Sequence, residues 1–374
     1  MRSPALRHVL THLITPLLMC IGMGLAYMGA FVTPEPHHLP VAVVGTAPRT
    51  KVFAQTVKDT AGDRLDVRTV ATRADAVRLL ESRDVTGAYV PSAKAPELLV
   101  ATAASDMGAT AVEKVFTPVA AEQGTPLKVT DVAAPVADDP TGQGLFFLLV
   151  AVSIGSYASV AALGAAGAAL AMRVRALLAL GVSAVVGGIG ALLAGPVFHL
   201  AHHDLAGVWG MAWLYSAGIL LVGVGLHTFL KRWTTLAMMV LFVMLNFTSS
   251  GGLFRPELQN GFFGALHAFW NGAGFVEGAR SLLYFGSDGL ARNVWTLAGW
   301  LLAGLLVTAG AALYERTRRP LQRTAHPEAG TGRAAGTTSH GPAAREEAEA
   351  EAEADAEADA EEEAEEEIEE TVGV

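Results

Sequence analysis

The sequence predicts an α-helical polytopic membrane protein of six spans with an inserted extracytoplasmic α/β domain. Three observations lead to this fold class. Six apolar segments of about span length contain no Asp, Glu, Lys or Arg. A polar block, residues 34–143, separates the first of them from the second and alternates between strand and helix patterns. Basic residues gather in every second short loop, as expected when these loops face the cytoplasm.

The composition supports a membrane protein and assigns the acidity to one region. Hydrophobic residues make up 52% of the 374 residues, which is more than an ordinary soluble domain contains. Residues 346–370 hold 16 of the 36 acidic residues and no Lys or Arg, so the remaining 20 acidic residues face 26 basic ones and the rest of the chain carries +6. The net charge of −10 therefore describes the C-terminal tract. The single cysteine, Cys20, excludes an intramolecular disulfide and a Cys-rich metal site.

Residues 1–33 are predicted to form the first span. Arg2 and Arg7 precede an apolar stretch from 9 to 32. A signal peptide has an apolar core of roughly 7–15 residues, and this stretch is longer. We therefore expect an uncleaved span with its N-terminus in the cytoplasm.

Residues 34–143 are predicted to form one extracytoplasmic α/β domain. Short β-branched runs predict strands at Leu39–Val44, Leu65–Val70, Val85–Val90, Leu98–Thr102 and Leu127–Val132. Helices are predicted between them at Thr50–Ala61, Thr72–Ser82 and Asp106–Gln123. Thr72 is the expected N-cap of the second helix, with Asp75 in its first turn. Alternating strands and helices indicate βαβ units and a small sheet.

Residues 144–314 contain five further spans, predicted at 145–171, 177–198, 206–230, 234–254 and 293–314. A charge at mid-membrane costs roughly 2.5–3.5 kcal/mol on insertion scales, so the absence of charges makes each segment a good span. Gly187, Ala191 and Gly195 recur at four-residue spacing, which predicts close contact between helix backbones.

The basic residues set the predicted orientation. The loops expected inside carry Arg2, Arg7, Arg173, Arg175, Lys231, Arg232, Arg316, Arg318, Arg319 and Arg323. The loop 199–205, expected outside, carries no Lys or Arg. This asymmetry predicts a multi-pass protein of the cell membrane with both termini in the cytoplasm. Residues 315–374 are predicted to form a disordered cytoplasmic tail, acidic and Ala/Glu-rich from 346.

The stretch 254–286 is apolar but too interrupted to cross a bilayer. Ser249-Ser250-Gly251-Gly252 breaks the preceding span, and Arg255-Pro256 turns the chain. Gly274, Glu277 and Arg280 interrupt the apolar residues after this turn. Irregular backbone near membrane depth needs protein or a water-filled cavity around it. We therefore predict an outer re-entrant hairpin packed against other spans.

This region resembles a known family. The resemblance lies in Ser250-Gly251-Gly252, an apolar residue, Pro256, Phe262-Phe263, and Arg280 ahead of Tyr284-Phe285. These residues resemble the end of the fifth span in type-two ABC exporter permeases, and most closely the YhgE/Pip (phage-infection-protein-like) branch. The strand end Gly87–Pro91 is similar to the extracytoplasmic domain of that branch. The resemblance implies export of a hydrophobic or cell-envelope-related substrate along a path between two protomers of a homodimer, with the hairpin gating its outer mouth.

The expected partners follow from the same comparison. The chain has no G-x-x-x-x-G-K-[ST] motif, so an ATP-driven exporter would need a separate ATPase subunit. The loop Met172–Ala176, with Arg173 and Arg175, is too short for the usual coupling helix. This departure speaks against ATPase coupling and agrees better with the YhgE/Pip branch. Membrane lipids are the other expected partners, whereas no cofactor and no nucleic acid are indicated.

The predicted translocation path or outer gate comprises Asn246, Ser249, Ser250, Gly251, Gly252, Pro256, Glu277 and Arg280. Glu277 and Arg280 are three residues apart and can pair on one helix face. Ionisable residues at membrane depth are functional candidates, although a pair can also serve only to reduce the cost of burial. Asn246, Thr248, Ser249 and Ser250 either line a polar cavity or cap the end of the fifth span.

The polar segment 199–204 is the best metal-like cluster. His199 and His203 would lie one helical turn apart, and Asp204 could complete a set of ligands. A short polar loop at the membrane surface has the same composition, so no metal is assigned. Serines in the spans lack a neighbouring His and acid, and no enzyme activity is predicted.

Two function classes remain from the sequence. The first is a permease-like membrane component of an exporter. The alternative is a non-transporting envelope receptor or scaffold that uses the extracytoplasmic domain for binding. The spans lack the carboxylates expected of a proton or sodium relay, which argues against an ion-coupled transporter.

Overall fold

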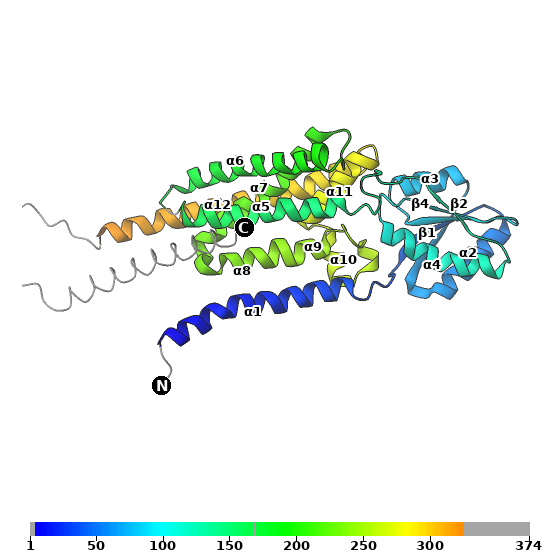
Figure 1. Ribbon diagram of the computed structural model, residues 1–374, viewed down its shortest axis with the longest axis horizontal. Helices are drawn as coiled ribbons and strands as arrows, with labels where there is room; N and C mark the ends of the chain where they lie inside the picture. Colours follow the sequence, from blue (N-terminus) through cyan, green and yellow to red (C-terminus); the bar gives the residue numbers. More distant parts are fainter. Residues whose placement is uncertain (1–3, 168, 325–374) are drawn as a thin grey trace, which may run out of the picture. The chain divides into compact units, whose positions relative to one another are not determined.

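The computed structural model describes residues 4–167 and 169–324. The chain divides into two units, Met1–Pro320 and Leu321–Val374. The described part is mostly helical and contains a small mixed sheet (Figure 1). Five helical stretches in it are long and apolar enough to cross a membrane: Leu13–Phe31, Gly144–Gly164, Met172–Val197, Leu205–Ser249 and Leu290–Thr317.

The sheet forms from the polar block between the first two apolar helices. Its strands are β1 (Leu39–Val44), β2 (Leu65–Val70), β3 (Gly87–Val90), β4 (Glu97–Val100) and β5 (Lys128–Asp131). Their order is β2-β1-β3-β4-β5. Strand β1 pairs in parallel with both β2 and β3, β3 pairs antiparallel with β4, and β4 pairs in parallel with β5. All five predicted strands are present, with ends shifted by at most two residues.

Three helices cover the two faces of the sheet, namely α2 (Pro48–Ala61), α3 (Arg73–Glu81) and α4 (Asp106–Glu122). Because side chains alternate along a strand, Leu39 and Val41 of β1 pack with α2 and α4, whereas Ala42 and Val44 pack with α3. Right-handed crossovers on opposite sides of β1 place α2 and α3 on opposite faces.

The N-cap predicted for the second helix of this domain is confirmed. The Thr72 hydroxyl accepts a hydrogen bond from the Asp75 amide at 3.1 Å, and the Asp75 carboxylate accepts one from the Thr72 amide at 3.0 Å. This reciprocal capping box fixes the start of α3.

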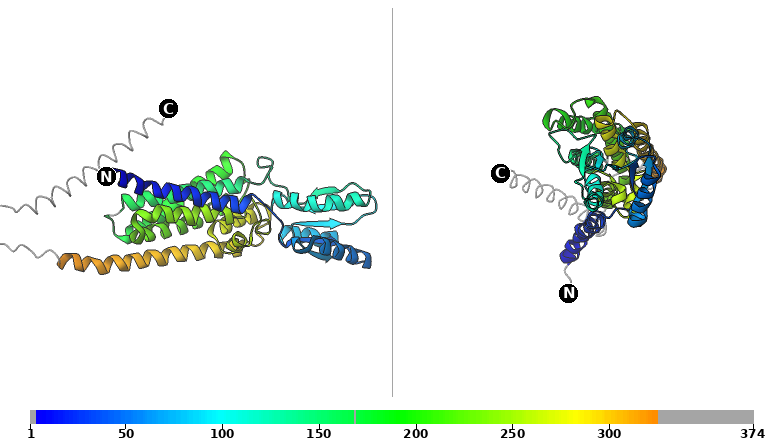
Figure 2. Two further views of the ribbon diagram at one scale, coloured as in Figure 1. Left: turned by 90° about the horizontal axis from the view of Figure 1, so that it is seen from below. Right: turned by 90° about the vertical axis from the view of Figure 1, so that its right-hand side faces the viewer.

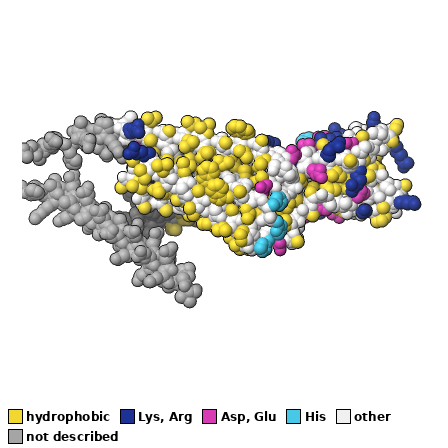
Figure 3. All heavy atoms as spheres, turned by 90° about the horizontal axis from the view of Figure 1, so that it is seen from above, with side chains coloured by type: hydrophobic (Ala, Val, Ile, Leu, Met, Phe, Trp, Pro, Cys, Tyr) yellow, Lys and Arg dark blue, Asp and Glu magenta, His cyan; other side chains and the backbone are white. Residues whose placement is uncertain are grey.

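The long helices form a bundle, with α1 (Pro4–Phe31) and α12 (Leu290–Thr324) on its outside (Figure 2). The other long helices are α5 (Gly144–Ala165), α6 (Met172–Leu192) and α7 (Leu205–Leu230). The short helices α8 (Thr234–Met239) and α9 (Leu245–Ser249) are joined by a π-helical turn, Val240–Met244, into one further leg of the bundle. Helix α12 continues past residue 314, where the tail was predicted to begin, and the acidic tract lies outside the described residues. On the face seen in Figure 3, hydrophobic side chains cover most of the helical part, and charged side chains gather over the part that contains the sheet and at the opposite end of the helices.

The stretch Leu205–Ser249 folds back on itself. Lys231 takes a positive φ of 47°, and a short 3-10 turn, Lys231–Trp233, separates α7 from α8. The Asn246 side-chain amide donates a hydrogen bond of 2.6 Å to the Tyr215 hydroxyl, although the two residues are 31 positions apart. In one straight helix they would be about 46 Å apart. The stretch therefore consists of two antiparallel legs.

The predicted loop at Met172–Ala176 is wrong. Helix α6 begins at Met172, and the connection from α5 is 166–171, of which residue 168 is outside the described part. Small Ala and Gly residues give the end of α5 few side-chain contacts, so that helix stops earlier than its hydropathy suggests. Arg175 consequently lies in α6, where its side chain is only 6% exposed and pairs with Glu315 of α12.

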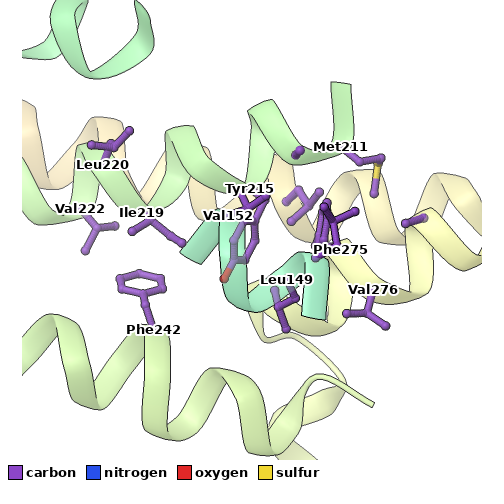
Figure 4. Packing of buried hydrophobic residues seen from close by; sticks show 14 of the residues in the cluster. Leu149, Val152, Met211, Tyr215, Ile219, Leu220, Val222, Phe242, Phe275 and Val276 are labelled. Carbon is purple, nitrogen blue, oxygen red and sulfur yellow. The ribbon is translucent and has the colours of Figure 1, made fainter. Parts of the chain in front are cut away.

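The centre of the bundle is closely packed around Tyr215 of α7. Figure 4 shows its ring among Leu149 and Val152 of α5 and Phe275 of α11 (Asn271–Tyr284). The Tyr215 and Phe275 ring centroids are 5.2 Å apart. A Cβ on Gly187 would lie 2.9 Å from the Trp213 amide, so the predicted close contact at Gly187 is the approach of α6 to α7.

Between α9 and α12 the chain forms two short helices. A 3-10 turn at Pro256–Leu258 is followed by α10 (Gly261–His267) and then α11, and both helices are shorter than a span. The Asn271 side-chain amide at the start of α11 donates to the Tyr215 carbonyl at 3.2 Å. Tyr215 lies about 15 Å along α7 from Leu205. The turn between α10 and α11 therefore reaches well into the bundle.

Candidate functional site

Five charged side chains from three parts of the chain meet where the sheet domain contacts α11. Arg83 lies in the loop after α3, Arg255 and Glu257 lie in the loop after α9, and Glu277 and Arg280 lie in α11. We call these five residues the hairpin charge cluster. Three guanidinium groups face two carboxylates, so the cluster carries a net positive charge.

Glu277 is the centre of the cluster. One carboxylate oxygen accepts a hydrogen bond from Arg83 at 2.8 Å, and the other accepts one from Arg280. The predicted Glu277–Arg280 pair is therefore present. Arg83 also donates to the Ser281 hydroxyl at 2.6 Å and to the Asp288 carbonyl at 3.0 Å. The side chains of Arg280 and Arg83 are only 3% and 12% exposed, so these contacts are shielded from solvent.

The second ion pair is local. Arg255 donates to both carboxylate oxygens of Glu257, at 3.1 and 3.2 Å, and to the Arg83 carbonyl at 3.4 Å. Burial acts to raise the pKa of Glu277, but Arg280 and Arg83 outweigh it, and the pKa lies below that of a free glutamate. The pKa of Glu257 is likewise lowered, because Arg255 outweighs the effect of burial. Both carboxylates are therefore ionised at neutral pH.

His267 of α10 lies beside the cluster. Its Nδ1 is 2.9 Å from the Ser249 carbonyl oxygen, so the neutral ring carries its proton on Nδ1. Burial lowers the pKa of His267, and the neighbouring Glu277 only partly opposes this effect. The ring is therefore neutral at pH 7.

A polar cavity of about 440 Å³ opens next to the cluster. Its lining includes Arg83, Arg255, His267, Glu277 and Arg292. The lining also includes Asp84 and Glu257, so three arginines face three carboxylates and the charged side chains around the cavity balance.

We call residues 254–286, which contain α10 and α11, the α10–α11 segment. Apolar side chains at its two ends pack against the two faces of the sheet domain. Leu258, 2% exposed, and Phe254 join the apolar cluster of α2 and α4. Phe285 and Tyr284 join the apolar cluster of α3 on the other face. The Arg83 guanidinium lies over the Phe285 ring, 5.2 Å from its centroid. The sheet domain and this segment are thus joined by apolar packing as well as by ion pairs.

A second polar group, which we call the tip network, surrounds the turn between α10 and α11. The Asn246 side-chain oxygen accepts a hydrogen bond from the Gly272 amide at 2.7 Å, and the Tyr215 hydroxyl lies 2.5 Å from the Ser153 hydroxyl. Asn246, Tyr215, Ser153 and Asn271 are all fully buried. The network joins α5, α7, α9 and α11 through hydrogen bonds that water does not weaken.

The predicted path residues near the end of α9 separate into two groups. Asn246 belongs to the tip network. The hydroxyls of Thr248, Ser249 and Ser250 donate to carbonyls of their own helix, at Met244, Leu245 and Phe247. These hydroxyls are buried, which supports the interpretation that they cap the span rather than line a cavity.

The predicted glycines and Pro256 shape the turn after α9. Gly251 has a φ of 74°, and a Cβ there would lie 2.6 Å from His267 Cε1. Gly252 has Phe146 of α5 against it, 2.7 Å from where a Cβ would be. Pro256 starts the 3-10 turn. These residues position the cluster without contributing charge to it.

The polar segment 199–204 does not form the predicted helical turn. Residues 198–204 are irregular, and His199, His203 and Asp204 are exposed. The His199 ring stacks on His202 instead, with centroids 6.4 Å apart. Within residues 4–167 and 169–324 no group of three His, Cys, Asp or Glu side chains is arranged to hold a metal ion.

Several members of these clusters were not among the predicted site residues. Arg83 resembles other arginines of the sheet domain in sequence, and only folding brings it to Glu277, 194 positions away. For His267 and Tyr215 the sequence offers one weak indication. Both polar side chains lie inside apolar segments, and polar side chains in such positions usually have buried partners.

No family model matches the chain, and neither the curated proteins nor the solved structures include a match. The function of this chain is therefore inferred from its own residues and contacts.

Proposed function

We propose that this protein is a permease-like membrane component of an exporter for a hydrophobic or cell-envelope-related substrate. The proposal places it in the cell membrane with six spans, both termini in the cytoplasm and the sheet domain outside. It keeps the type-two ABC exporter permeases, in their YhgE/Pip branch, as the family that the sequence resembles.

Counting crossings supports six spans. The sheet domain follows α1, and the α10–α11 segment follows α9. The Arg83–Glu277 ion pair requires the domain and this segment to be on the same side of the membrane. If Leu205–Ser249 crossed once, they would be on opposite sides. With the reversal at Lys231–Trp233 the stretch crosses twice, and both lie outside.

The observation that carries the proposal is the continuous connection from the sheet domain to the tip network. Arg83 contacts Glu277 in the middle of α11 and Ser281 nearer its C-terminal end. At the N-terminal end of α11, Asn271 contacts Tyr215 and Gly272 contacts Asn246. A rigid helix of 14 residues transmits a displacement from one end to the other. Movement of the sheet domain would therefore shift the tip, as an outer gate requires.

The proposed path runs between two protomers, with lipid around them. The residues assigned to the outer gate are Glu277, Arg280, Asn246 and the turn Gly251–Pro256. Export by this route needs an energy source outside the chain, and the candidate is a separate ATPase subunit.

Efflux assays test this proposal. Cells that produce the full chain are loaded with a panel of fluorescent hydrophobic dyes, and the rate of dye loss is measured. Dye loss should be faster with the wild type than with Arg83→Gln, which keeps a polar side chain but breaks the pair with Glu277. Arg64→Gln, an exposed charge in the same domain, is the matched control. Equal efflux by wild type, Arg83→Gln and empty-vector cells at equal membrane levels would contradict export.

A receptor or scaffold remains the second candidate because of Arg175. In the resembled exporters a helix in the cytoplasmic loop after the second span contacts the ATPase, whereas here Arg175 lies in α6 and is buried against Glu315. Purification of the full chain from native membranes separates the two functions. A co-purifying ATPase favours export, whereas a bound envelope protein without an ATPase or dye efflux favours the receptor.

A further inference from the structure

A cavity of about 610 Å³ lies in the sheet domain, away from the hairpin charge cluster. It is bounded by the start of α2, the loop after β3 and the end of α4. Its lining includes Arg49, Phe53, Tyr89, Pro91, Ala93 and Gln123.

The topology explains why a cavity forms here. From the end of β1 the chain passes through α2 to β2 on one side, whereas β3 pairs on the other side of β1. The loops that follow β1 and β3 therefore diverge and leave a crevice at the carboxyl ends of these parallel strands. Open α/β sheets bind ligands at this kind of switch point.

The N-terminus of α2 faces the cavity without a side-chain cap. The N-cap residue is Ala47, which has no capping group, and Pro48 follows at the first helical position. The 14-residue helix has no acidic residue in its first turn and carries Arg49 there instead. A positive side chain at the positive end of a helix dipole is unfavourable unless an anion lies between them.

Tyr89 supplies an independent indication of a ligand. The residue is 0% exposed, and its ring is stacked between Phe53 and Phe116, with centroids 5.3 and 4.9 Å away. Within the described residues its hydroxyl has no hydrogen-bond partner. An interaction with the Gln123 side chain acts to lower the pKa of Tyr89, but this contact does not meet the distance and angle of a hydrogen bond to the hydroxyl. Burial raises the pKa of Tyr89, so the hydroxyl keeps its proton and is available as a donor.

We propose that this cavity is a binding site for a small ligand that carries an anionic oxygen group, either a carboxylate or a phosphate. The group would accept hydrogen bonds from the Arg49 backbone amide and guanidinium and from the Tyr89 hydroxyl. Of the first amides of α2, those of Thr50 and Lys51 already donate to the Ala47 carbonyl, at 2.9 and 3.2 Å. Phe53, Pro91 and Ala93 offer apolar surface to the remainder of the ligand. This site does not depend on the proposed export function, because its residues belong only to the sheet domain.

Titration of the purified full chain in dodecyl maltoside tests the site. The probes are inorganic phosphate and acetate at constant ionic strength, followed by calorimetry. We expect saturable binding of at least one anion, and the tighter of the two identifies the group that the site prefers. Arg49→Gln should weaken this binding about tenfold, because it removes a charge-assisted hydrogen bond. Arg64→Gln, an exposed charge elsewhere in the domain, should leave it unchanged.

Tyr89→Phe provides the second variant. Because the hydroxyl has no partner in the described structure, its removal should not lower the thermal midpoint of the ligand-free protein, yet it should weaken anion binding several-fold. Absence of saturable binding of both anions up to about 10 mM would overturn the proposal. An equal loss of affinity in Arg64→Gln, or full affinity in Tyr89→Phe, would overturn it as well.

Discussion

Glu277 of α11 joins the α10–α11 segment to the sheet domain through an ion pair. Its two oxygens bind arginines that come from different parts of the chain, Arg83 and Arg280. Removal of one partner from a buried ion pair is costly because the other charge stays buried. A single substitution in the cluster should therefore lower the stability of the protein, and the loss should be larger for a buried member than for an exposed charge nearby.

Arg280→Ala is expected to impair stability and function more than Arg292→Ala. Arg280 is 3% exposed and binds Glu277, whereas the Arg292 side chain is exposed and makes no ion pair in the described part of the chain. The loss for Arg280→Ala should be about 3 kcal/mol. Thermal unfolding in detergent and dye efflux at equal membrane levels measure the two effects. Equal stability and equal efflux of the two variants would refute the role of the cluster.

His267 should make stability depend on pH near neutrality. Burial lowers the pKa of His267 below its ordinary value of 6.5, so the unfolded chain takes up the proton first as pH falls. The contribution of neutral His267 to the free energy of unfolding is fully present above pH 6.5 and declines as the pH falls below this value. The neighbouring charges are Glu277 on α11 and Arg255 and Glu257 on the preceding loop, and the carboxylates stay ionised in this range.

The midpoint of thermal unfolding is measured at a series of pH values from 8 to 5. We expect a plateau above pH 7 and a decline below 6.5 for the wild type. His267→Asn retains a donor for the Ser249 carbonyl but does not titrate, so its decline should be smaller. An unchanged slope in this variant would exclude His267 as the source.

At the scale of elements, the turn after α9 determines where α10 and α11 begin. Gly251 has a φ of 74°, a conformation that favours glycine, and its Cα faces His267 and Glu277. The arrangement of the cluster therefore depends on a backbone position that carries no side chain.

Gly251→Ala is expected to destabilise the protein by more than about 1 kcal/mol, because the new Cβ is strained and lies 2.6 Å from His267 Cε1. Gly261→Ala at the start of α10 is the control, since a Cβ there has no neighbour within 4 Å. The control should be neutral or slightly stabilising, because alanine favours helix. The midpoints of thermal unfolding of the two variants in detergent measure this difference in stability. Equal midpoints would contradict the role of Gly251 in the turn.

At the scale of the whole molecule, the proposed topology depends on the reversal at Lys231–Trp233. This reversal converts one apolar stretch of 45 residues into two legs and allows the sheet domain and the α10–α11 segment to lie on one side. Both the proposed outer gate and the proposed anion site would then face the extracytoplasmic space.

Cysteine accessibility tests this topology in whole cells. With Cys20 replaced by Ala, a cysteine at Asp75 in α3 should react with an impermeant thiol reagent, and one at Glu357 should react only after the cells are opened. Both expectations follow from six crossings with cytoplasmic termini. The reverse labelling pattern would invert the topology and remove the outer gate from the proposal.

The sequence predicted the sheet domain closely, because strands and helices there follow local rules. Short β-branched runs predicted the bounds of β1 and β2 to the residue, and the Thr72–Asp75 capping box is a contact between near neighbours in the chain. Apolar length likewise predicted the helices of the bundle. Hydropathy did not predict where α5 ends, because small apolar residues suit a span and a loop equally well.

By itself the sequence determined the apolar helices, the strands of the small mixed sheet and the pairing of Glu277 with Arg280, since each depends on residues close together in the chain. Tertiary structure alone decided that Arg83 completes this pair, that Arg175 is buried against Glu315, and that the Tyr89 hydroxyl is left without a partner in the described residues. The physical reason is that a charged group or hydroxyl forms hydrogen bonds with the groups that folding places within about 3 Å of it. When such a partner is distant in the sequence, no local pattern predicts it.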